Sequence, residues 1–597
     1  MFQSFDAPTS PEQGAPRLAD LRAELTREGL DAFIVPRADA HQGEYVAARD
    51  DRLAWLTGFT GSAGFCAALK GVAGVFIDGR YRVQVRDQTA DCYTPVHWPE
   101  TQLGPWLVEH LPNGGTVGID PWLHTLGDAT KLNTQLAGSG IKVVETENLV
   151  DRIWHDQPAR PASPVTKYPK ELAGAGDETK RGNISKILRD TGQASAVLTL
   201  PDSICWLLNI RGADIPKIPV THAFAVLHAD GQMDLFSDPE KFESLGSDPA
   251  ITLHHWDAFE AVLKSLAGPV RVDKDTAPLA VTRILEAAGI DIAYAPDPCI
   301  LPKARKNPTE IAGTRAAHLR DGAAMCEFLA WLDETAPQGG LSEIDVVKKL
   351  EGFRRATNAL KDISFDTICG AGPHGAVVHY RVTEGTNRVI APGELLLVDS
   401  GGQYLDGTTD ITRTMAIGAH TGEQRACFTR VLQGMIAISM ARWPKGLAGR
   451  DLDALARIAL WRAGQDYDHG TGHGVGTYLS VHEGPQRISK VSDVTLEPGM
   501  ILSNEPGYYR DGAFGIRIEN LVVVQMADAI EGGDAREMLD FETITWVPID
   551  RTLIDVEMLT QAERVWLNSY HTDVFAKMAP RVSETTKNWL TQATAAI

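Results

Sequence analysis

The last third of the chain contains apolar segments that end in an acidic residue. Residues 394–399, Glu-Leu-Leu-Leu-Val-Asp, predict a buried strand that ends at Asp399. A Ser-Gly-Gly connection leads into the Thr-rich segment 408–414, which predicts a second strand with Asp410 inside it. Two strands joined by a short glycine-containing connection predict a hairpin that brings the two carboxylates together. Because burying two carboxylates is costly without a cation or a proton, the pair indicates either a metal site or two solvent-facing acids at strand ends.

Three more segments of this region supply donors that suit a metal. The loop 468–476 has glycines on both sides of its histidine, which permit a close approach to a compact site. A second apolar strand, 501–507, also ends in a carboxylate, and residues 515–520 alternate between isoleucine and charged side chains with a period of two. These segments contribute His473, Glu505 and Glu519, with Arg517 on the same predicted strand face as Glu519.

Four carboxylates and one imidazole suit two divalent cations, because the formal charges of the carboxylates and of the cations cancel. Oxygen-rich ligation favours Mn²⁺, although the imidazole keeps Zn²⁺, Co²⁺ and Fe²⁺ as alternatives. Two such ions about 3.5–4 Å apart would hold and acidify a bridging water for hydrolysis. The region therefore predicts a hydrolytic centre with two metal ions.

The order of these five donors resembles the ligand pattern of the M24 metallopeptidases, whose catalytic domain has the pita-bread fold. The sequence motifs around the donors also resemble those of this family: Val-Asp-Ser-Gly, Thr-Asp-Ile-Thr-Arg-Thr, Gly-His-Gly-Val-Gly, His-Glu-Gly-Pro, Asn-Glu-Pro-Gly and Arg-Ile-Glu-Asn. Segments 39–45, 58–64, 547–550 and 566–571 extend the resemblance over almost the whole chain, to the three-domain, cytosolic-type Xaa-Pro aminopeptidases. This resemblance implies hydrolysis of an N-terminal Xaa-Pro peptide bond by a hydroxide that bridges two metal ions.

The resemblance also implies roles for individual residues. Asp399 and Asp410 would hold the first metal, and Asp410 would bridge to the second or lean towards it. His473 would complete the second metal site together with Glu505, which is also the expected proton shuttle, and with Glu519, the expected bridging ligand.

Two other histidines match the family pattern without being ligands. His379 and His482 are expected to stabilise the oxyanion and to hold the prolyl carbonyl region. Arg517 is expected to orient Glu519 from the same strand face; the alternative is a solvent-exposed ion pair. His374 and His469 are left outside the predicted site, although His469 could support it from its place in the loop of His473.

The first half of the chain indicates an internal duplication. A helical pattern followed by the strand-like run 32–36 returns later in the chain, before the run 195–200. Beside these runs lie two similar octapeptides, whose tryptophans Trp55 and Trp206 are 151 residues apart. A chance recurrence of Trp-Leu before glycine is the alternative. The duplication predicts two related α/β domains, 1–154 and 155–305, ahead of a pita-bread domain with a C-terminal extension, 306–597. Residues 1–15 predict a frayed tail.

Net charge, apolar runs and cysteine content limit the partners and the cellular location expected for the protein. The net charge of −21 repels phosphate backbones and anionic membrane surfaces, so we expect neither nucleic-acid nor membrane binding. No apolar run approaches the roughly 18 residues of a membrane-spanning helix, and the first residues lack a signal-peptide pattern. The seven scattered cysteines predict buried thiols in a reducing cytoplasm. Homodimerisation and peptide substrates with proline at the second position are implied by the resemblance.

Three other functions compete with this prediction. A prolidase, which cleaves only Xaa-Pro dipeptides, shares all five ligands, but the tandem N-terminal domains favour the aminopeptidase. Creatinase, a metal-free relative, should lack the ligands that are complete here. A catalytically silent peptide-binding module would typically have lost ligands.

Overall fold

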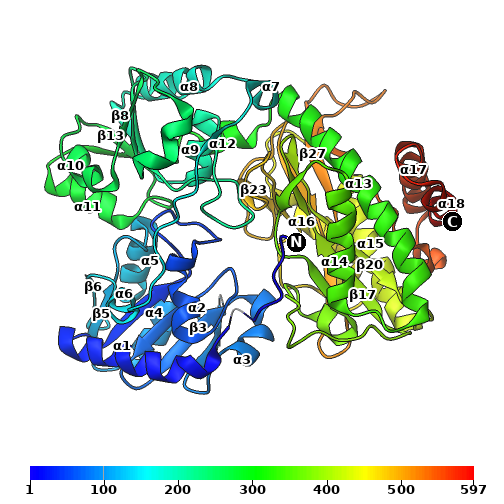
Figure 1. The fold of residues 1–597 in the computed structure, drawn as a ribbon, viewed down its shortest axis with the longest axis horizontal. Helices are drawn as coiled ribbons and strands as arrows, with labels where there is room; N and C mark the ends of the chain where they lie inside the picture. Colours follow the sequence, from blue (N-terminus) through cyan, green and yellow to red (C-terminus); the bar gives the residue numbers. More distant parts are fainter. Residues whose placement is uncertain (8, 99) are drawn as a thin grey trace. The chain divides into compact units, whose positions relative to one another are not determined.

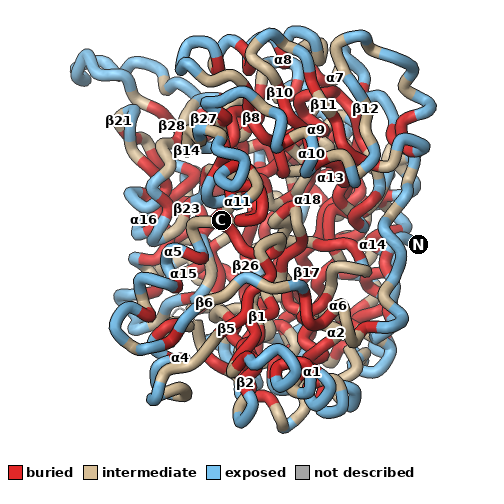
Figure 2. Tube along the Cα trace, turned by 90° about the vertical axis from the view of Figure 1, so that its left-hand side faces the viewer, coloured by how far each residue is buried: buried red, intermediate tan, exposed pale blue. Residues whose placement is uncertain are grey.

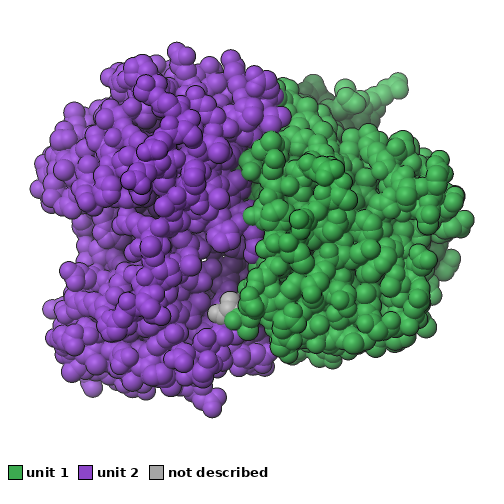
Figure 3. Space-filling model, in the orientation of Figure 1, with its two compact units in different colours: residues 1–7, 304–597 green, residues 8–303 purple. Residues whose placement is uncertain are grey.

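The computed structural model describes residues 1–7, 9–98 and 100–597. These residues form two compact units, one of residues 8–303 and one that joins residues 1–7 to residues 304–597 (Figure 3). The chain crosses between the units twice, after residue 7 and after residue 303, so the unit of residues 8–303 is inserted between the two parts of the other. We call them the N-terminal unit and the catalytic unit. Buried residues line the strands of each, for example β1 and β17 (Figure 2).

The N-terminal unit contains two six-stranded sheets with the same topology. Their strand orders are β4-β3-β2-β1-β5-β6 and β12-β11-β10-β8-β13-β14. In both sheets the central strand pairs antiparallel with one neighbour and parallel with the other. The strands are β1 Ala32–Pro36, β2 Phe65–Leu69, β3 Ala73–Ile77, β4 Thr94–His97, β5 Gly115–Ile119, β6 Ile141–Glu145, β8 Ser195–Leu198, β10 Phe224–His228, β11 Met233–Phe236, β12 Ile251–His254, β13 Val270–Val272 and β14 Ile292–Tyr294, with the short pair β7 Thr166–Lys167 and β9 Ile210–Arg211. The predicted pair of related α/β domains is therefore confirmed.

Helices cover the two sheets and repeat the duplication (Figure 1). The octapeptides of Trp55 and Trp206 begin in α2 and α9, which follow the central strands β1 and β8. An isolated bridge pairs Thr125 with Pro278, the N-caps of α5 and α11, so equivalent points of the two halves meet. The helices are α1 Gly14–Glu28, α2 Arg52–Thr57, α3 Gln84–Gln88, α4 Leu103–His110, α5 Leu126–Gln135, α6 Leu149–Ile153, α7 Lys170–Ala173, α8 Asp177–Asp190, α9 Pro201–Leu208, α10 Phe259–Leu263, α11 Leu279–Ala287 and α12 Ile300–Ala304.

The catalytic unit is built on antiparallel sheets with helices packed around them (Figure 1). A six-stranded sheet has the order β21-β28-β27-β24-β22-β23, and two three-stranded sheets have the orders β16-β17-β20 and β15-β18-β19. Its strands are β15 Leu360–Ile363, β16 Ile368–Ala371, β17 Leu395–Ser400, β18 Gly402–Tyr404, β19 Gly407–Thr408, β20 Ile411–Ala416, β21 Arg442–Pro444, β22 Gly472–Gly474, β23 Glu483–Ile488, β24 Ile501–Asn504, β25 Gly507–Arg510, β26 Phe514–Arg517, β27 Asn520–Met526 and β28 Met538–Thr543. Its helices are α13 Pro308–Thr335, α14 Glu343–Ala356, α15 Gly422–Ser439, α16 Gly449–Trp461, α17 Gln561–Met578 and α18 Glu584–Ala593. Among the described residues, no helix has the length and apolar character that crossing a membrane requires.

The predicted hairpin is present, with a difference in detail. Strands β17 and β20 pair antiparallel, so that Asp399 lies opposite Thr412. The expected second strand is split into β19 and β20, and Asp410 lies between them rather than inside a strand. The predicted strand through residues 515–520 is likewise interrupted. The amide of Glu519 donates to the carbonyl of Thr412 at 3.1 Å, outside the sheet ladder, so β26 ends at Arg517.

The prediction of a frayed N-terminal tail is wrong for the first seven residues. The side chain of Gln3 exchanges two hydrogen bonds with the backbone of Thr367, at 2.9 and 3.3 Å. The amide of Phe2 donates to the carboxylate of Glu351, and Phe5 is buried in the core of the catalytic unit. Because these partners lie more than 340 positions along the chain, no local pattern could reveal them.

Candidate metal centre

Strand ends and tight loops of the catalytic unit position the five predicted donors. Asp399 is the penultimate residue of β17, His473 is the middle residue of β22, and Glu505 follows β24 directly. Asp410 and Glu519 occupy the breaks before β20 and β27. The structure brings Asp410, His473 and Glu519 together, with one donor atom of each within 4.8 Å of the others. We call all five residues the five-donor cluster.

The imidazole of His473 faces two carboxylates. Its Nδ1 lies 3.0 Å from the carbonyl of Gly474 and donates to it, so Nε2 carries the lone pair of the neutral ring. Nε2 lies 3.5 Å from Oδ2 of Asp410 and 3.4 Å from Oε1 of Glu505. Burial alone would lower the pKa of His473, yet these carboxylates raise it to about 9. The two carboxylates therefore favour a cation at Nε2 of His473, either a proton or a metal ion.

Two other carboxylates each have one oxygen held and one oxygen free. Oδ2 of Asp399 accepts from Arg517, and Oε2 of Glu519 accepts from the hydroxyl of Thr412 at 2.8 Å. Oδ1 of Asp399 and Oε1 of Glu519 are buried without a hydrogen-bond partner. Burial and the neighbouring carboxylates raise the pKa of Asp399 to about 7 and that of Glu519 well above its usual value. Buried acceptors of this kind are typical of metal ligands.

Arg517 contacts a different carboxylate from the one predicted. Its Nη2 donates to Asp399 at 2.7 Å, and it reaches Glu519 only through Thr412, whose hydroxyl accepts from Nε at 3.2 Å. The side chain is 1 % exposed, so the alternative of a solvent-exposed ion pair is excluded. Strand β26 ends at Arg517, and the hydroxyl of Thr412 links the two side chains, accepting from Arg517 and donating to Glu519.

Sequence reasoning missed Tyr509. Its hydroxyl accepts from Nη1 of Arg517 at 2.6 Å and lies 2.8 Å from Nε2 of His469. Nδ1 of His469 donates to the carbonyl of Gly470, so Nε2 accepts from the Tyr509 hydroxyl. A chain of hydrogen bonds thus runs from His469 to Asp399. It gives His469 a supporting place beside the site, and no spacing pattern marks Tyr509 as part of it.

The other three histidines considered from the sequence differ in what they contact. The ring of His482 lies 4.3 Å from that of His473, centroid to centroid. His379 follows Val378, whose carbonyl accepts from Arg517 at 3.3 Å. His374 instead contacts the buried carboxylate of Glu343, whose Oε1 lies 2.9 Å from its Nδ1.

Similarity to known proteins follows the same division of the chain. Residues 312–526 match the metallopeptidase family M24, and residues 537–597 match the C-terminal region of that family. Residues 17–153 and 156–310 each match the creatinase/prolidase N-terminal domain. A probable Xaa-Pro aminopeptidase P of Talaromyces marneffei is 39 % identical over 609 residues, which cover 97 % of this chain and 92 % of that relative. The chain belongs to the Xaa-Pro aminopeptidase P family.

Other members of the aminopeptidase P family match over the same span. Aminopeptidase P1 of Arabidopsis thaliana is 36 % identical, over 97 % of this chain and 98 % of the relative. The crystal structure of an X-prolyl aminopeptidase from Caenorhabditis elegans, described as a cytosolic enzyme with a di-nuclear active site, superposes with a TM-score of 0.91. It is 32 % identical and covers 98 % of this chain and 100 % of its own. The predicted architecture of two N-terminal domains and an M24 catalytic domain is thereby confirmed, whereas the residue boundaries given above stay predictions.

The five-donor cluster fits the divalent metals of an M24 aminopeptidase P. Four carboxylates and a neutral imidazole match the charge of two divalent ions. The buried oxygens without partners and the imidazole nitrogen between carboxylates are the positions at which ligation would replace missing hydrogen bonds. Among the described residues, Arg517 pairs with Asp399, and Nε2 of His473 lies near Asp410 and Glu505.

Proposed function

We propose that this chain is a metal-dependent aminopeptidase that hydrolyses the N-terminal Xaa-Pro bond of peptides and releases the first residue. The observation that carries the proposal is the five-donor cluster. Two of its buried carboxylate oxygens have no hydrogen-bond partner, and its imidazole nitrogen faces two carboxylates. Membership of the aminopeptidase P family supplies the reaction class.

The five donors would divide between two cations. Asp399 and Asp410 would hold the first, and His473, Glu505 and Glu519 would complete the second, with Asp410 and Glu519 as the residues expected to serve both. Bound divalent ions lower the pKa of a water molecule and polarise the scissile carbonyl. Arg517 is a positioning residue, because its ion pair at 2.7 Å fixes the carboxylate of Asp399.

Glu505 is the proposed proton shuttle. The hydroxyl of Ser503 donates to its Oε1 at 3.0 Å, which orients the carboxylate, and burial raises its pKa. The carboxylate takes a proton from the attacking water as the new C–O bond forms. It then passes that proton to the prolyl nitrogen as the C–N bond breaks, which balances the hydrolysis.

The two non-ligand histidines are proposed to contact the substrate. The role of His482 is supported by its ring contact with His473. The role of His379 is supported by its position next to Val378, whose carbonyl accepts from Arg517. They would stabilise the developing oxyanion and hold the prolyl carbonyl region. A Xaa-Pro bond is a tertiary amide without N–H, so recognition must use the ring, the carbonyl groups and the free amine. The excess of carboxylates favours a substrate with an ammonium terminus.

Mn²⁺ is the proposed metal, since oxygen donors outnumber the single nitrogen donor. Homodimerisation and a cytoplasmic location are further proposals, and the location is supported by the cysteines. All seven lie in the described part of the chain, none is in a disulfide, and six are buried. Sedimentation at micromolar concentration tests the dimer, because a single mass near 64.8 kDa would contradict it.

The test of the activity compares peptides by mass spectrometry. Metal-stripped chain is incubated with an Arg-Pro-Pro oligopeptide and with the dipeptide Ala-Pro, each with and without Mn²⁺. We expect metal-dependent release of one N-terminal residue from the longer peptide. Cleavage confined to the dipeptide would identify a prolidase, and no cleavage with Mn²⁺, Zn²⁺ or Co²⁺ in a folded chain would identify a silent binding module.

A further inference from the structure

A second group of buried metal-ligating side chains lies in the N-terminal unit. Asp39 follows β1, Asp50 ends the short helical turn Ala48–Asp50, and His222 precedes β10. One donor atom of each lies within 4.8 Å of the others. We call these three residues the N-terminal cluster. Asp39 and Asp50 come from the first repeat and His222 from the second.

Two atoms of the N-terminal cluster are buried and unpartnered. Oδ2 of Asp39 and Nε2 of His222 have no hydrogen-bond partner, although their residues are 1 % and 5 % exposed. The two atoms face each other at 3.6 Å. Tetrahedral Zn²⁺ ligands at about 2.0–2.1 Å from the metal are separated by roughly 3.3–3.4 Å, so this spacing suits two ligands of one ion.

The surroundings hold both side chains in this orientation. The amides of His41 and Gly43 donate to Oδ1 of Asp39 at 2.9 and 3.2 Å, which leaves Oδ2 directed at the histidine. The amide of His222 donates to Asp214 at 2.7 Å, and its ring packs on that of His41 with centroids 4.4 Å apart. These contacts hold Oδ2 of Asp39 and Nε2 of His222 directed at each other.

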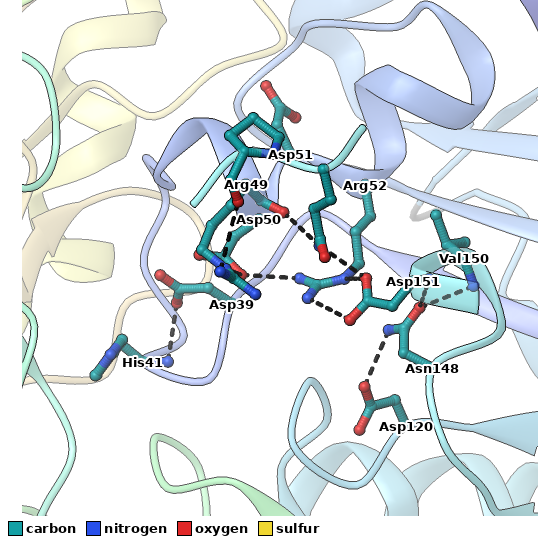
Figure 4. A network of polar contacts seen from close by, with 12 residues as sticks. Asp39, His41, Arg49, Asp50, Asp51, Arg52, Asp120, Asn148, Val150 and Asp151 are labelled. Atoms are coloured by element: carbon teal, nitrogen blue, oxygen red, sulfur yellow. Dashed lines mark hydrogen bonds and ion pairs between the residues drawn. The ribbon is translucent and has the colours of Figure 1, made fainter. Parts of the chain in front are cut away.

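The nearby arginines contact Asp50 of the cluster rather than Asp39. Arg52 makes two hydrogen bonds with Asp151, at 2.6 and 2.9 Å, and one with Asp50 at 3.0 Å, as Figure 4 shows. Arg49 approaches Asp50 at 3.9 Å. Among the described residues, the only ion-pair contact of Asp39 is with His222. A buried carboxylate without a cation is costly, so the arrangement has room for one more positive charge.

We propose that the N-terminal cluster binds one divalent transition-metal ion, with Zn²⁺ as the preferred occupant. One imidazole and two carboxylates give three protein ligands and leave the fourth position to water. Zn²⁺ binds such mixed nitrogen and oxygen donors more tightly than Mn²⁺ does. Because the ligands come from both repeats, the ion cross-links the two halves of the N-terminal unit and stabilises their contact. The site is separate from the five-donor cluster in the catalytic unit.

The experiment counts bound metal in the full chain. The five-donor cluster is first disabled by His473→Ala with Glu519→Gln, and the chain is stripped with a chelator and titrated with Zn²⁺ by calorimetry. We expect one equivalent to bind in this background. Adding Asp39→Asn or His222→Ala should remove that equivalent, or weaken it at least tenfold. Replacing Zn²⁺ with Co²⁺ should give an absorption spectrum of bound cobalt that His222→Ala abolishes.

Matched variants keep the inference falsifiable. His228→Ala removes another histidine of the same unit, which pairs with Asp234 at 2.9 Å, and should leave the stoichiometry unchanged. Asp50→Asn alters a half-buried ligand, so it serves if the buried variants fail to fold. Absence of zinc binding in the background chain overturns the proposal, as does binding that survives Asp39→Asn, Asp50→Asn and His222→Ala together. Since metal content is the readout, failure of the peptidase proposal would leave this result unaffected.

Discussion

The two groups of one histidine and neighbouring carboxylates differ in the charges around them. In the five-donor cluster, four carboxylates share a buried space with a single arginine, and burial with mutual repulsion raises the pKa of three of them. In the N-terminal cluster, Arg49 and Arg52 both contact Asp50, whereas the only ion-pair contact of Asp39 among the described residues is with His222. The first arrangement therefore has a large excess of negative charge, whereas the second has one carboxylate, that of Asp39, without an arginine partner.

This difference separates the chemistry that each group can perform. Excess buried carboxylate costs stability without metal, but it provides donors for two ions and a base for proton transfer. A group with three donors and one carboxylate without an arginine can hold one ion and offers no spare carboxylate as a base. Uncompensated buried charge therefore distinguishes a hydrolytic centre better than the presence of histidine and aspartate alone.

The largest expected effect is on turnover, when the proposed proton shuttle of the five-donor cluster is removed. Glu505→Gln keeps the shape of the side chain and removes its basicity, so turnover of an Arg-Pro-Pro peptide should fall by about 10²–10⁴-fold. Circular dichroism and the thermal midpoint should stay close to those of the unaltered chain. Glu497→Gln is the control, because that carboxylate pairs with Arg305 at the surface. Turnover near the unaltered level in Glu505→Gln would refute the shuttle role.

The next prediction compares the arginines of the two groups. Arg517→Ala leaves the buried carboxylate of Asp399 unpaired and should lower the free energy of unfolding of the catalytic unit by about 3–5 kcal/mol. Arg52→Ala should cost less, about 1.5–3 kcal/mol in the N-terminal unit, since the side chain of its partner Asp151 is 34 % exposed and water can replace the arginine. Hydrogen exchange at β17 and at α6 measures the two losses separately. Equal losses would contradict the assigned difference in burial.

Strand ends explain why so much of the five-donor cluster could be predicted from sequence. Asp399 and Glu505 end apolar runs, and such runs are visible as local patterns. The contact of Arg517 was predicted incorrectly, since the alternation of residues 515–520 gave no sign of the break after β26. A strand period describes neighbours on one strand, whereas the ion pair with Asp399 joins segments 118 positions apart.

Tertiary contacts account for the rest of what sequence could not reveal. Tyr509 enters the site through a hydrogen bond to Arg517, and Gln3 binds Thr367 from the far end of the chain. His222 joins Asp39 only because the two repeats pack together. The duplication itself was predictable from the tryptophan octapeptides, but the pairing of its halves was not.

A third histidine sharpens the comparison through its pH dependence. His571 is buried among arginines rather than carboxylates, and burial followed by Arg413 and Arg551 lowers its pKa to about 3. Its Nε2 accepts from the amide of Ile549 at 3.2 Å. The unfolded chain binds a proton at His571 below about pH 6.5, whereas the folded chain does so only near pH 3.

His571 therefore contributes stability that is fully present above about pH 6.5 and is lost as the pH falls towards 3. The expected slope is about 1.4 kcal/mol of unfolding free energy per pH unit in that window. Urea unfolding at pH 7, 6 and 5 should show this slope reduced in His571→Gln, which keeps an acceptor for the amide. His155→Gln alters an exposed histidine and is the control. An unchanged slope in His571→Gln would show that the imidazole is already protonated in the folded chain.

The smallest expected effect tests whether the two units unfold independently. Gly182 in α8 of the N-terminal unit and Gly352 in α14 of the catalytic unit are helical positions where an added Cβ meets nothing within 4 Å. Alanine at either position should stabilise its own helix by about 0.5–1 kcal/mol, because glycine loses more backbone entropy on folding. Calorimetry should show Gly182→Ala and Gly352→Ala raising different transitions. If both variants raise one common transition, the units unfold as a single cooperative body, and the losses assigned above to Arg517 and Arg52 would have to be compared on one shared free energy.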